Sequence, residues 1–466
     1  MSTDVSIYHK KTTEAEDNPA YDINPSDWMD EHKMADGALP LAKLTTTGTP
    51  SSSTFLRGDG AWASPSKSAH TYVIYKIGST YYAVKHDGTI LSNSNLETGL
   101  MPDVFTNMPN GGDILFKNEA ADGDYSIAQR IDMSGLDNFN IYGERGARIF
   151  LAASRPEVPA NREIFYANGL TNSKIKGLIL DGNYANSSAW TGVSAYGNIH
   201  LEGNCSNVDI EGNDILNAAM YGVFVSAYAG DTIENVNTQK NRFVQGGMWN
   251  SIYYLVWDAA GYGIKGCDIS FNDVQDFCDI GICVGQALGG TVENVNVHHN
   301  RIHNGNLSAT LGSSNPPAIF GIRFEGVVKK SSCHNNHGWL LRQGWADDAY
   351  GSNNVVHDNT FANDISGGSG VDIIQVMGTA EKIYSNILYN GKAWAAGIHM
   401  YGGTNVVENN TITKTGGSDV VGITEHPDFD PNDNVYKNND VRTCDYKITL
   451  ADGTGQIHSG NLGNGD

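Results

Sequence analysis

Acidic residues stand in or beside several short apolar stretches of this 466-residue chain, where they could perform acid–base chemistry. Asp258, Glu325 and Asp372 each adjoin a stretch that has the alternating pattern of a β-strand. Two carboxyl groups on one surface can cleave a glycosidic bond, because one protonates the leaving oxygen while the other activates water. We therefore predict Asp258, Glu325 and Asp372 as catalytic residues of a glycoside hydrolase.

Other polar and aromatic side chains are expected to contact the substrate. Strand alternation sends Arg323 to the same face as Glu325, where a guanidinium group can hold an anion or lower the pKa of a carboxyl group. Tryptophan side chains can stack on sugar rings, and Trp249, Trp257, Trp345 and Trp394 are the candidates. The predicted substrate-binding residues are Arg323, Arg342, His399, Tyr401, Trp257 and Glu202.

A second constellation suits a different reaction. Arg323, His399 and Tyr401 could support β-elimination or epimerisation of a uronate, in which a base removes the C5 proton and a cation neutralises the carboxylate. These three residues are expected to span about 14 Å, which is long for one small site.

These side chains must be positioned by a repeating architecture, which is marked by asparagines. An apolar residue recurs three positions before an asparagine, with steps of 30, 28, 31, 28, 36, 23, 27, 24 and 29 residues between asparagines. Such a period is typical of a stacked solenoid. The asparagines are Asn183, Asn213, Asn241, Asn272, Asn300, Asn336, Asn359, Asn386, Asn410 and Asn439.

The flanking sequence indicates that each repeat is a coil of β-strands. Short β-type stretches with polar turns, and no helical period between them, favour strands over helix pairs. Stacked asparagine amides can share hydrogen bonds from coil to coil, and asparagine also tolerates the left-handed backbone of a tight corner. The sequence therefore predicts an all-β solenoid with about ten or more coils.

Coil counting sets the expected distances in the site. Asp258, Glu325 and Asp372 fall on the third, fifth and seventh coils, so neighbours are expected about 9–10 Å apart. This is the upper edge of the roughly 6.5–9.5 Å that an inverting glycosidase requires. The longest asparagine step contains extra residues near 303–317, which predict a loop beside Glu325. On the third coil the sequence leaves the phase of the strand open; an inward Leu255 and Trp257 would send Asp258 outward.

Composition limits the other options. The net charge of −22 is unfavourable for nucleic-acid binding and less favourable for acidic than for neutral polysaccharides. The six cysteines have no metal-ligand spacing and are expected to be mostly small core residues. No signal peptide and no membrane span are apparent.

Metal binding is weakly supported by the sequence. His298, His299, His334 and His337 cluster near the asparagine corner, but turn histidines are the favoured interpretation. Residues 428–434 alternate oxygen ligands like a calcium loop, yet they lack the glycine at position six and the closing glutamate. We predict no metal site and no required cofactor, and calcium is the one ion that the sequence leaves open.

Two family resemblances extend this prediction. Residues 39–62, which include GTPSSSTFLRGDGAW, resemble a short module of bacteriophage tail-fibre and tailspike proteins. A short helix expected at 100–108 and the GGDILF strand at 111–116 resemble the start of pectate-lyase-like proteins. The second resemblance implies a right-handed single-stranded parallel β-helix with three sheets and a capping helix, in a superfamily that hosts lyases, hydrolases, epimerases and inert spikes.

The expected organisation follows from these resemblances. Residues 1–66 are a flexible tail-fibre-like segment, 67–112 a β-hairpin and capping region, and 113–466 the parallel β-helix. We predict a carbohydrate-active protein of the cell exterior or a virion that cleaves a polysaccharide in a surface groove, as a homotrimer or a monomer. A uronate lyase or epimerase and a non-catalytic glycan-binding tail fibre are the alternatives.

Overall fold

The computed structural model describes most of the chain beyond residue 70. The described residues are 55–56, 62–63 and 71–463, without 119–123, 153–162, 184–196, 219, 229, 245–249, 258–262, 278, 288, 304–319, 348–350, 364–370, 428–431 and 452–456. The chain divides into two units, residues 1–68 and residues 69–466. In the first unit, strands β1 (Phe55–Leu56) and β2 (Trp62–Ala63) pair in antiparallel fashion.

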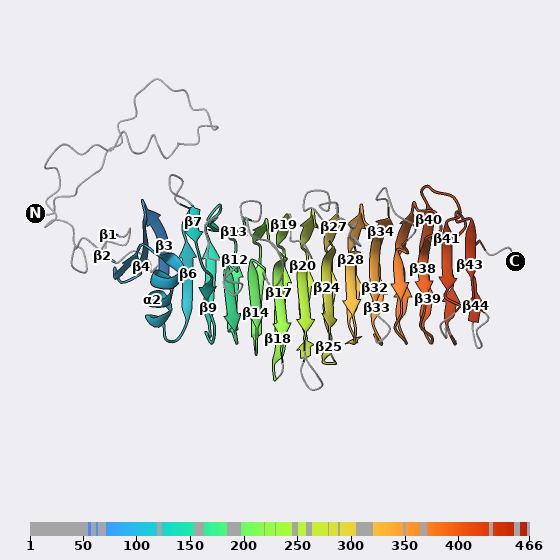
Figure 1. Ribbon diagram of the computed structural model, residues 1–466, viewed down its shortest axis with the longest axis horizontal. Coiled ribbons are helices and arrows are strands. Elements are labelled where there is room, and N and C mark those ends of the chain that lie inside the picture. Colours follow the sequence, from blue (N-terminus) through green and yellow to red (C-terminus); the bar gives the residue numbers. More distant parts are fainter. Residues whose placement is uncertain are drawn as a thin grey trace, which may run out of the picture. The chain divides into compact units, whose positions relative to one another are not determined.

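The second unit is a right-handed single-stranded parallel β-helix, as predicted. Its coils lie side by side from the blue to the red end of the ribbon (Figure 1). Each full coil contributes to all three parallel sheets. The described part of the chain contains no helix that is both long and apolar enough to cross a membrane.

An eleven-stranded sheet forms one side of the solenoid. Its strands are β7 (Asp124–Ile127), β10 (Arg148–Leu151), β13 (Ile179–Asp181), β16 (Asp214–Leu216), β19 (Arg242–Val244), β23 (Asp273–Gln275), β27 (Arg301–His303), β31 (His337–Trp339), β34 (Thr360–Asn363), β37 (Ile387–Asn390) and β40 (Thr411–Lys414).

A twelve-stranded sheet forms the second side. Its strands are β8 (Ile131–Asp132), β11 (Phe165–Asn168), β14 (Ile199–Glu202), β17 (Tyr221–Ala227), β20 (Asn250–Val256), β24 (Ile280–Gln286), β28 (Phe320–Glu325), β32 (Gln343–Asp347), β35 (Ile374–Val376), β38 (Ala396–Met400), β41 (Val421–Glu425) and β43 (Tyr446–Thr449).

The third sheet closes the coils, and in its middle some coils contribute two short segments. Its parallel strands are β6 (Gly112–Phe116), β9 (Phe139–Gly143), β12 (Thr171–Lys176), β15 (Ser206–Glu211), β18 (Thr232–Gln239), β21 (Gly263–Lys265), β22 (Asp268–Ser270), β25 (Thr291–Glu293), β26 (Asn296–His298), β29 (Val328–Lys329), β30 (Ser332–His334), β33 (Val355–His357), β36 (Lys382–Tyr384), β39 (Val406–Glu408), β42 (Val435–Lys437) and β44 (Ile457–Ser459).

A hairpin and a short helix cover the N-terminal end of the core. Strands β3 (Tyr72–Ile77), β4 (Thr80–Lys85) and β5 (Ile90–Asn93) pair in antiparallel fashion, and β3 continues in parallel onto β6. A π-helical turn, η2 (Leu96–Leu100), leads into α2 (Met101–Thr106), and Asn95 caps it by accepting the Thr98 N–H. The apolar face of α2 is buried, so it shields the first coil from water.

Ten buried or partly buried asparagines form a ladder between the third sheet and the eleven-stranded sheet. At Asn300, the backbone N–H and the side-chain Nδ2 both donate to Asn336 Oδ1 over 3.0 Å, and Nδ2 also donates to the Ile269 carbonyl over 2.9 Å. The same pattern recurs in each coil, so each amide in the interior of the ladder is fully paired. The ladder consists of Asn213, Asn241, Asn272, Asn300, Asn336, Asn359, Asn386, Asn410, Asn439 and Asn461.

Two details of the predicted ladder are wrong. Asn183 lies outside it, because its coil places Leu178 at the ladder position, and Asn461 extends it at the other end. The left-handed backbone also belongs to the residue before each ladder asparagine, such as Phe271 with φ 56°. The ladder asparagine therefore supplies the amide, and its predecessor turns the corner.

A second, shorter ladder runs parallel to the first, and each of its residues precedes a residue of the first ladder by five positions in the sequence. Ser331, Asn354, Glu381, Asn405 and Asn434 occupy it, and their side-chain oxygens accept backbone N–H groups of neighbouring coils at most rungs. Glu381 is the anomaly, because a fully buried carboxyl group replaces an amide. Burial and the charge of Asp347 raise the pKa of Glu381 to about 9.

We expect the asparagine ladder to contribute strongly to stability. Asn300→Ala removes the acceptor of two N–H groups of Asn272 and should lower the free energy of unfolding by about 2–4 kcal/mol. Urea denaturation measures this loss. Asn183→Gly is the control, because Asn183 lies outside the ladder and glycine readily adopts its φ of 51°. This substitution should lower the free energy of unfolding by about 1 kcal/mol or less. Equal losses in both variants would contradict the assignment.

Glu381 should make stability depend on pH. In the folded state the carboxyl group keeps its proton up to a pH of about 9, whereas the ordinary pKa of glutamate is 4.5. Between these two pH values the native state therefore binds one proton that the unfolded state has lost. Stability should therefore fall as the pH rises through this range. In Glu381→Gln the amide cannot ionise, and its urea midpoint should decrease less between pH 6 and pH 9. An identical decrease in both proteins would refute this role.

Candidate functional site

The outer face of the twelve-stranded sheet carries three rows of side chains because of a column of glycines. In six of the twelve strands the second residue is a glycine that points inward to the corner; a Cβ on Gly281 would lie 2.7 Å from Ile302. The residue before this glycine therefore faces outward beside the residue two positions after it, as the stacked rings of Tyr221 and Phe224 at 4.7 Å indicate. Outward residues can thus meet within one strand at a spacing of three.

A middle cluster surrounds the predicted catalytic residue Glu325. Its carboxylate lies 3.4 Å from the Arg323 guanidinium, accepts a hydrogen bond from Tyr253 over 3.1 Å, and lies 3.5 Å from Cys283 Sγ. Burial raises the pKa of both Tyr253 and Cys283 well above the ordinary values, and the charge of Glu325 acts in the same direction. Both groups are therefore neutral, and Tyr253 can donate its proton to Glu325 in a hydrogen bond.

Asp279 interacts electrostatically with this cluster and was missed by sequence reasoning. It precedes β24, in which Gly285 pairs with Glu325, so Asp279 lies six residues along the strand from the position opposite Glu325. Burial raises its pKa to about 6, with Glu325 adding to the rise and Arg323 opposing it. The register places Arg342 in the same row as Asp279, two strands away or about 10 Å. The sequence feature that could have indicated Asp279 is its position two residues before Gly281, at the start of a strand.

The structure resolves the phase of the third coil, and Leu255 does not face the core. Tyr254 and Val256 face the core, whereas Leu255 packs on the outside with Tyr253 and Cys283. Trp257 lies at the end of β20 and is 36% exposed. Asp258 lies outside the described residues. Trp345, a candidate for sugar stacking, is fully buried in the core, and Trp249 also lies outside the described residues.

A second cluster brings together Asp372, His399 and Tyr401. Asp372 Oδ2 lies 2.6 Å from His399 Nδ1, and Asp372 Oδ1 accepts the Ala396 N–H over 2.8 Å, so the carboxylate orients the imidazole. The Tyr401 ring lies 4.2 Å from that of His399, and both contact the His426 ring. Burial and the charge of Asp372 raise the pKa of Tyr401 to about 12. The arrangement suits a histidine base with a neutral tyrosine beside it.

The two clusters are separate, which corrects the expected distances. The strand register aligns Glu325 with Met377, which follows Asp372 by five residues. The two carboxyl groups are therefore about 15 Å apart rather than 9–10 Å. Coil counting gave the distance along the solenoid axis but ignored the distance along the strand. Arg323 and His399 share a row three strands apart, about 14 Å, so Arg323 does not join the second cluster.

Glu202 belongs to a third cluster about 19 Å from Glu325 along the axis. Its carboxylate accepts hydrogen bonds from Tyr166 and Asn168 and lies 3.5 Å from His200 Nε2. The fully buried Glu163 lies 3.5 Å from the other nitrogen of His200. Glu202 is thus positioned by this network rather than beside the predicted catalytic residues.

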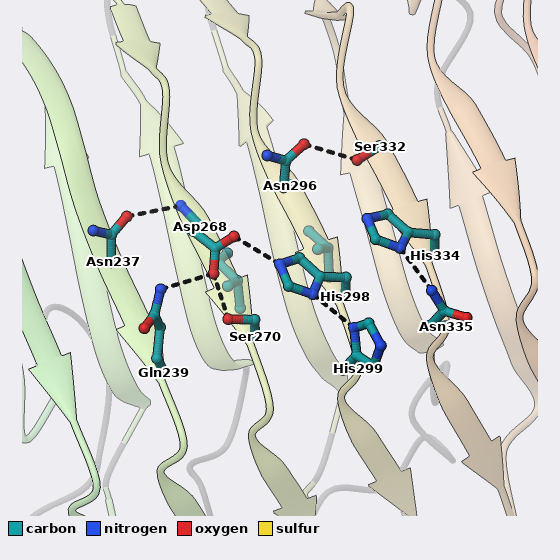
Figure 2. Close-up of polar contacts among 12 residues, drawn as sticks. Asn237, Gln239, Asp268, Ser270, Asn296, His298, His299, Ser332, His334 and Asn335 are labelled. Carbon is teal, nitrogen blue, oxygen red and sulfur yellow. Dashed lines mark hydrogen bonds and ion pairs between the residues drawn. The ribbon is translucent and has the colours of Figure 1, made fainter.

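Three of the four predicted histidines, His298, His299 and His334, lie together at the third sheet (Figure 2), whereas His337 begins β31 of the eleven-stranded sheet. His298 and His334 stack in parallel at 4.8 Å, and His298 lies 2.8 Å from both Asp268 and His299. Burial and the neighbouring histidines lower the pKa of His334 to about 4. Among the described residues, three or more histidine, cysteine or acidic side chains nowhere converge in a way that could hold a metal ion.

The calcium-like loop and the cysteines can be placed in part. Residues 428–431 lie outside the described residues, and the Asn434 side chain is a rung of the second ladder that also donates to Glu425. Cys205, Cys267, Cys283, Cys333 and Cys444 are buried and unpaired with one another, and Cys278 lies outside the described residues.

No protein-family model and no curated protein sequence match this chain. Solved structures do resemble it in fold. A mutant of DFA-IIIase from Arthrobacter chlorophenolicus in complex with DFA-III is 12% identical, with a TM-score of 0.53, over 77% of this chain and 95% of that one. The A-module of a mannuronan C-5 epimerase from Azotobacter vinelandii is 16% identical, with a TM-score of 0.48, over 77% and 92%. The surface adhesin PfbA of Streptococcus pneumoniae is 12% identical, with a TM-score of 0.47, over 79% and 89%.

The charges around Asp279 predict how its pKa responds to substitution. Arg323→Met removes the cation that opposes the rise, so the pKa should increase above 6, whereas Glu325→Gln removes an anion and should decrease it. Carbon-13 NMR titration of labelled aspartate measures both shifts. Arg301→Met, on the eleven-stranded sheet, is the control and should leave the pKa unchanged. Shifts of the opposite sign would rule out this electrostatic coupling.

Proposed function

We propose that this protein hydrolyses glycosidic bonds of a polysaccharide bound on the outer face of the twelve-stranded sheet. The observation that carries the proposal is the Glu325 carboxylate held by Arg323 and Tyr253, together with Asp279 on the adjacent coil, whose pKa responds to the charges of Glu325 and Arg323. Burial raises the pKa of Asp279 to about 6, so near neutral pH a fraction of it retains the proton that a leaving group requires.

The two carboxyl groups would have different roles. Asp279 transfers its proton to the glycosidic oxygen while the bond from that oxygen to the anomeric carbon breaks. A water molecule attacks the anomeric carbon, and Glu325 accepts the proton that the water loses. Arg323 holds the Glu325 carboxylate in place, and the Tyr253 hydroxyl donates a second hydrogen bond to it. The rate should therefore fall as the pH rises above about 6, because Asp279 loses its proton.

The fold is compatible with a sugar substrate. Carbohydrate-active proteins are among the β-helix structures that this chain resembles, including the DFA-IIIase in complex with DFA-III. At this low identity the resemblance concerns the fold, so the residues carry the argument for the reaction. Arg323 and Arg342 on the same face supply positive charge that a substrate with acidic groups would meet.

A uronate lyase or epimerase is the second candidate, and the Asp372–His399 contact of 2.6 Å favours it. In this reaction His399, oriented by Asp372, removes the C5 proton, and Tyr401 donates a proton to the leaving oxygen or to the opposite face of C5.

The proposal includes an extracellular or virion location, which rests on the resemblance of residues 39–62 to tail-fibre modules. Calcium dependence is tested in the same assay, which is run with and without calcium, and the proposal also includes a homotrimeric or monomeric state.

Glu325→Gln should abolish hydrolysis. The amide cannot accept a proton, so kcat/KM should fall by ~10²–10⁴-fold, and Asp279→Asn should do the same because it removes the acid. The assay is a panel of neutral and uronate polysaccharides, with and without calcium, that measures new reducing ends and the ultraviolet absorbance of unsaturated uronates. Glu408→Gln, on the outer face of the third sheet, is the matched control and should retain full activity.

The outcomes separate the candidates. Reducing ends without ultraviolet absorbance, lost in both variants, would support hydrolysis by the middle cluster. Absorbance together with reducing ends, lost in His399→Ala but kept in Glu325→Gln, would transfer the activity to the second cluster. Exchange of the C5 proton without new ends would indicate an epimerase. Silence across the panel with a folded protein would favour a glycan-binding fibre.

A further inference from the structure

Trp394 is an exposed aromatic residue in a strained backbone conformation. Its side chain is 68% exposed, the highest fraction among the large hydrophobic residues that the structure describes. Its φ is 60°, in the left-handed region that a bulky residue seldom adopts. Left-handed corners recur along this solenoid, so the φ of Trp394 is a feature of the fold, but neither burial nor backbone preference explains why a tryptophan occupies this corner.

Tyr446 lies beside Trp394 and is also exposed, at 45%. The two ring centroids are 6.2 Å apart, and the ring planes differ by 25°. Asp419 fixes both residues, because its carbonyl accepts the Trp394 N–H over 3.2 Å and its carboxylate accepts the Tyr446 hydroxyl over 3.3 Å. The pair is therefore held in place before any ligand binds, which lowers the entropic cost of binding.

The aromatic pair adjoins the cluster of Asp372 and His399. Trp394 precedes by two residues Ala396, whose N–H binds the Asp372 carboxylate. The register places Tyr446 in the row of Asp372, three strands further along or about 14 Å away. A chain molecule lying along the solenoid axis would contact the rings and the cluster at the same time.

The size and the surroundings of the pair favour a sugar over a protein partner. A stable protein interface covers about 800 Å² on each partner, which two rings cannot supply. Charged groups border them, including the Asp445 carboxylate bound to Lys414 over 2.8 Å. An aromatic face beside fixed hydrogen-bonding groups suits a pyranose ring, whose C–H face packs on the ring while its hydroxyls bind the polar groups.

We infer that Trp394 and Tyr446 form a platform that binds one pyranose ring of a glycan next to Asp372 and His399. The inference rests on the proposed glycan substrate but not on which cluster cleaves it. The platform is a positioning element, because neither ring belongs to a cluster that exchanges protons with the substrate.

The test uses the full chain labelled with 5-fluorotryptophan and fluorine NMR. The probes are cellohexaose, maltohexaose, chitohexaose and hexagalacturonate at millimolar concentration, because stacking uses C–H faces that all pyranoses share. At least one probe should shift the Trp394 signal, which is assigned by its absence in Trp394→Gly. Tyr446→Ala should weaken that binding by about tenfold.

Stability gives a second readout. Trp394→Gly removes a side chain that buries little surface and relieves the left-handed strain, so Tm should stay constant or rise slightly. If the protein cleaves a polysaccharide, the KM for that polysaccharide should increase in this variant. Phe271→Gly is the matched control, since Phe271 has a φ of 56° and is 51% exposed on another corner. It should have the same effect on Tm and no effect on binding.

The results distinguish this inference from the proposed function. A Trp394 shift without turnover would support the platform and refute the hydrolase. Turnover that Trp394→Gly and Tyr446→Ala leave unchanged would overturn the platform and keep the hydrolase. No shift with any of the four probes, or a Tm that decreases by several degrees in Trp394→Gly but not in Phe271→Gly, would also overturn the platform.

Discussion

The hydrogen-bonded stack of asparagine amides is the constraint on which the rest of the β-helix depends. Each ladder residue binds the coil before it and the coil after it, so consecutive coils have one relative position in which every amide is satisfied. A coil shifted by one residue would leave buried donors and acceptors unpaired. Because the register is fixed at this corner, the loops at the other corners can differ in length without disturbing the stacking.

This fixed register determines which outer side chains can meet. Equal spacing places the same row position of neighbouring strands about 4.8 Å apart, so side chains in adjacent coils interact directly, and a long side chain such as Tyr253 reaches Glu325 two coils away. The inward glycines then bring residues three apart in one strand side by side, as at Ile280 and Cys283. The three polar clusters of the twelve-stranded sheet arise from these two rules, and each is a local feature of two to four coils.

The repeat could be predicted from the sequence because the same residue type, asparagine, recurs in each coil, usually three residues after an apolar residue. Nine of the ten predicted asparagines belong to the ladder; Asn183 was included because it follows an apolar residue in the same way, although its coil turns elsewhere. The second ladder was not predicted because Ser331 and Glu381 interrupt the run of amides. Arg323 with Glu325, and His399 with Tyr401, were correctly assigned to one face by strand alternation.

Distances within the site could not be predicted in the same way. Sequence patterns give the number of coils between two residues, but the position along the strand depends on the bulge at each glycine. For this reason Glu325 and Asp372 were expected together, whereas in the structure Glu325 contacts Arg323 and Tyr253, and Asp372 contacts His399. The raised pKa of Asp279 arises from burial by residues distant in the sequence, and no local motif encodes it.

The asparagine ladder also has a direction. In each step the N–H groups of one asparagine point to the oxygen of the asparagine in the next coil, so the amide dipoles align along the solenoid axis with their positive ends toward Asn461. Aligned dipoles add, as they do in an α-helix. The stack is therefore polar like a helix although it is built of strands, and a group that continues it beyond Asn461 must offer an acceptor, such as a carbonyl or carboxylate oxygen.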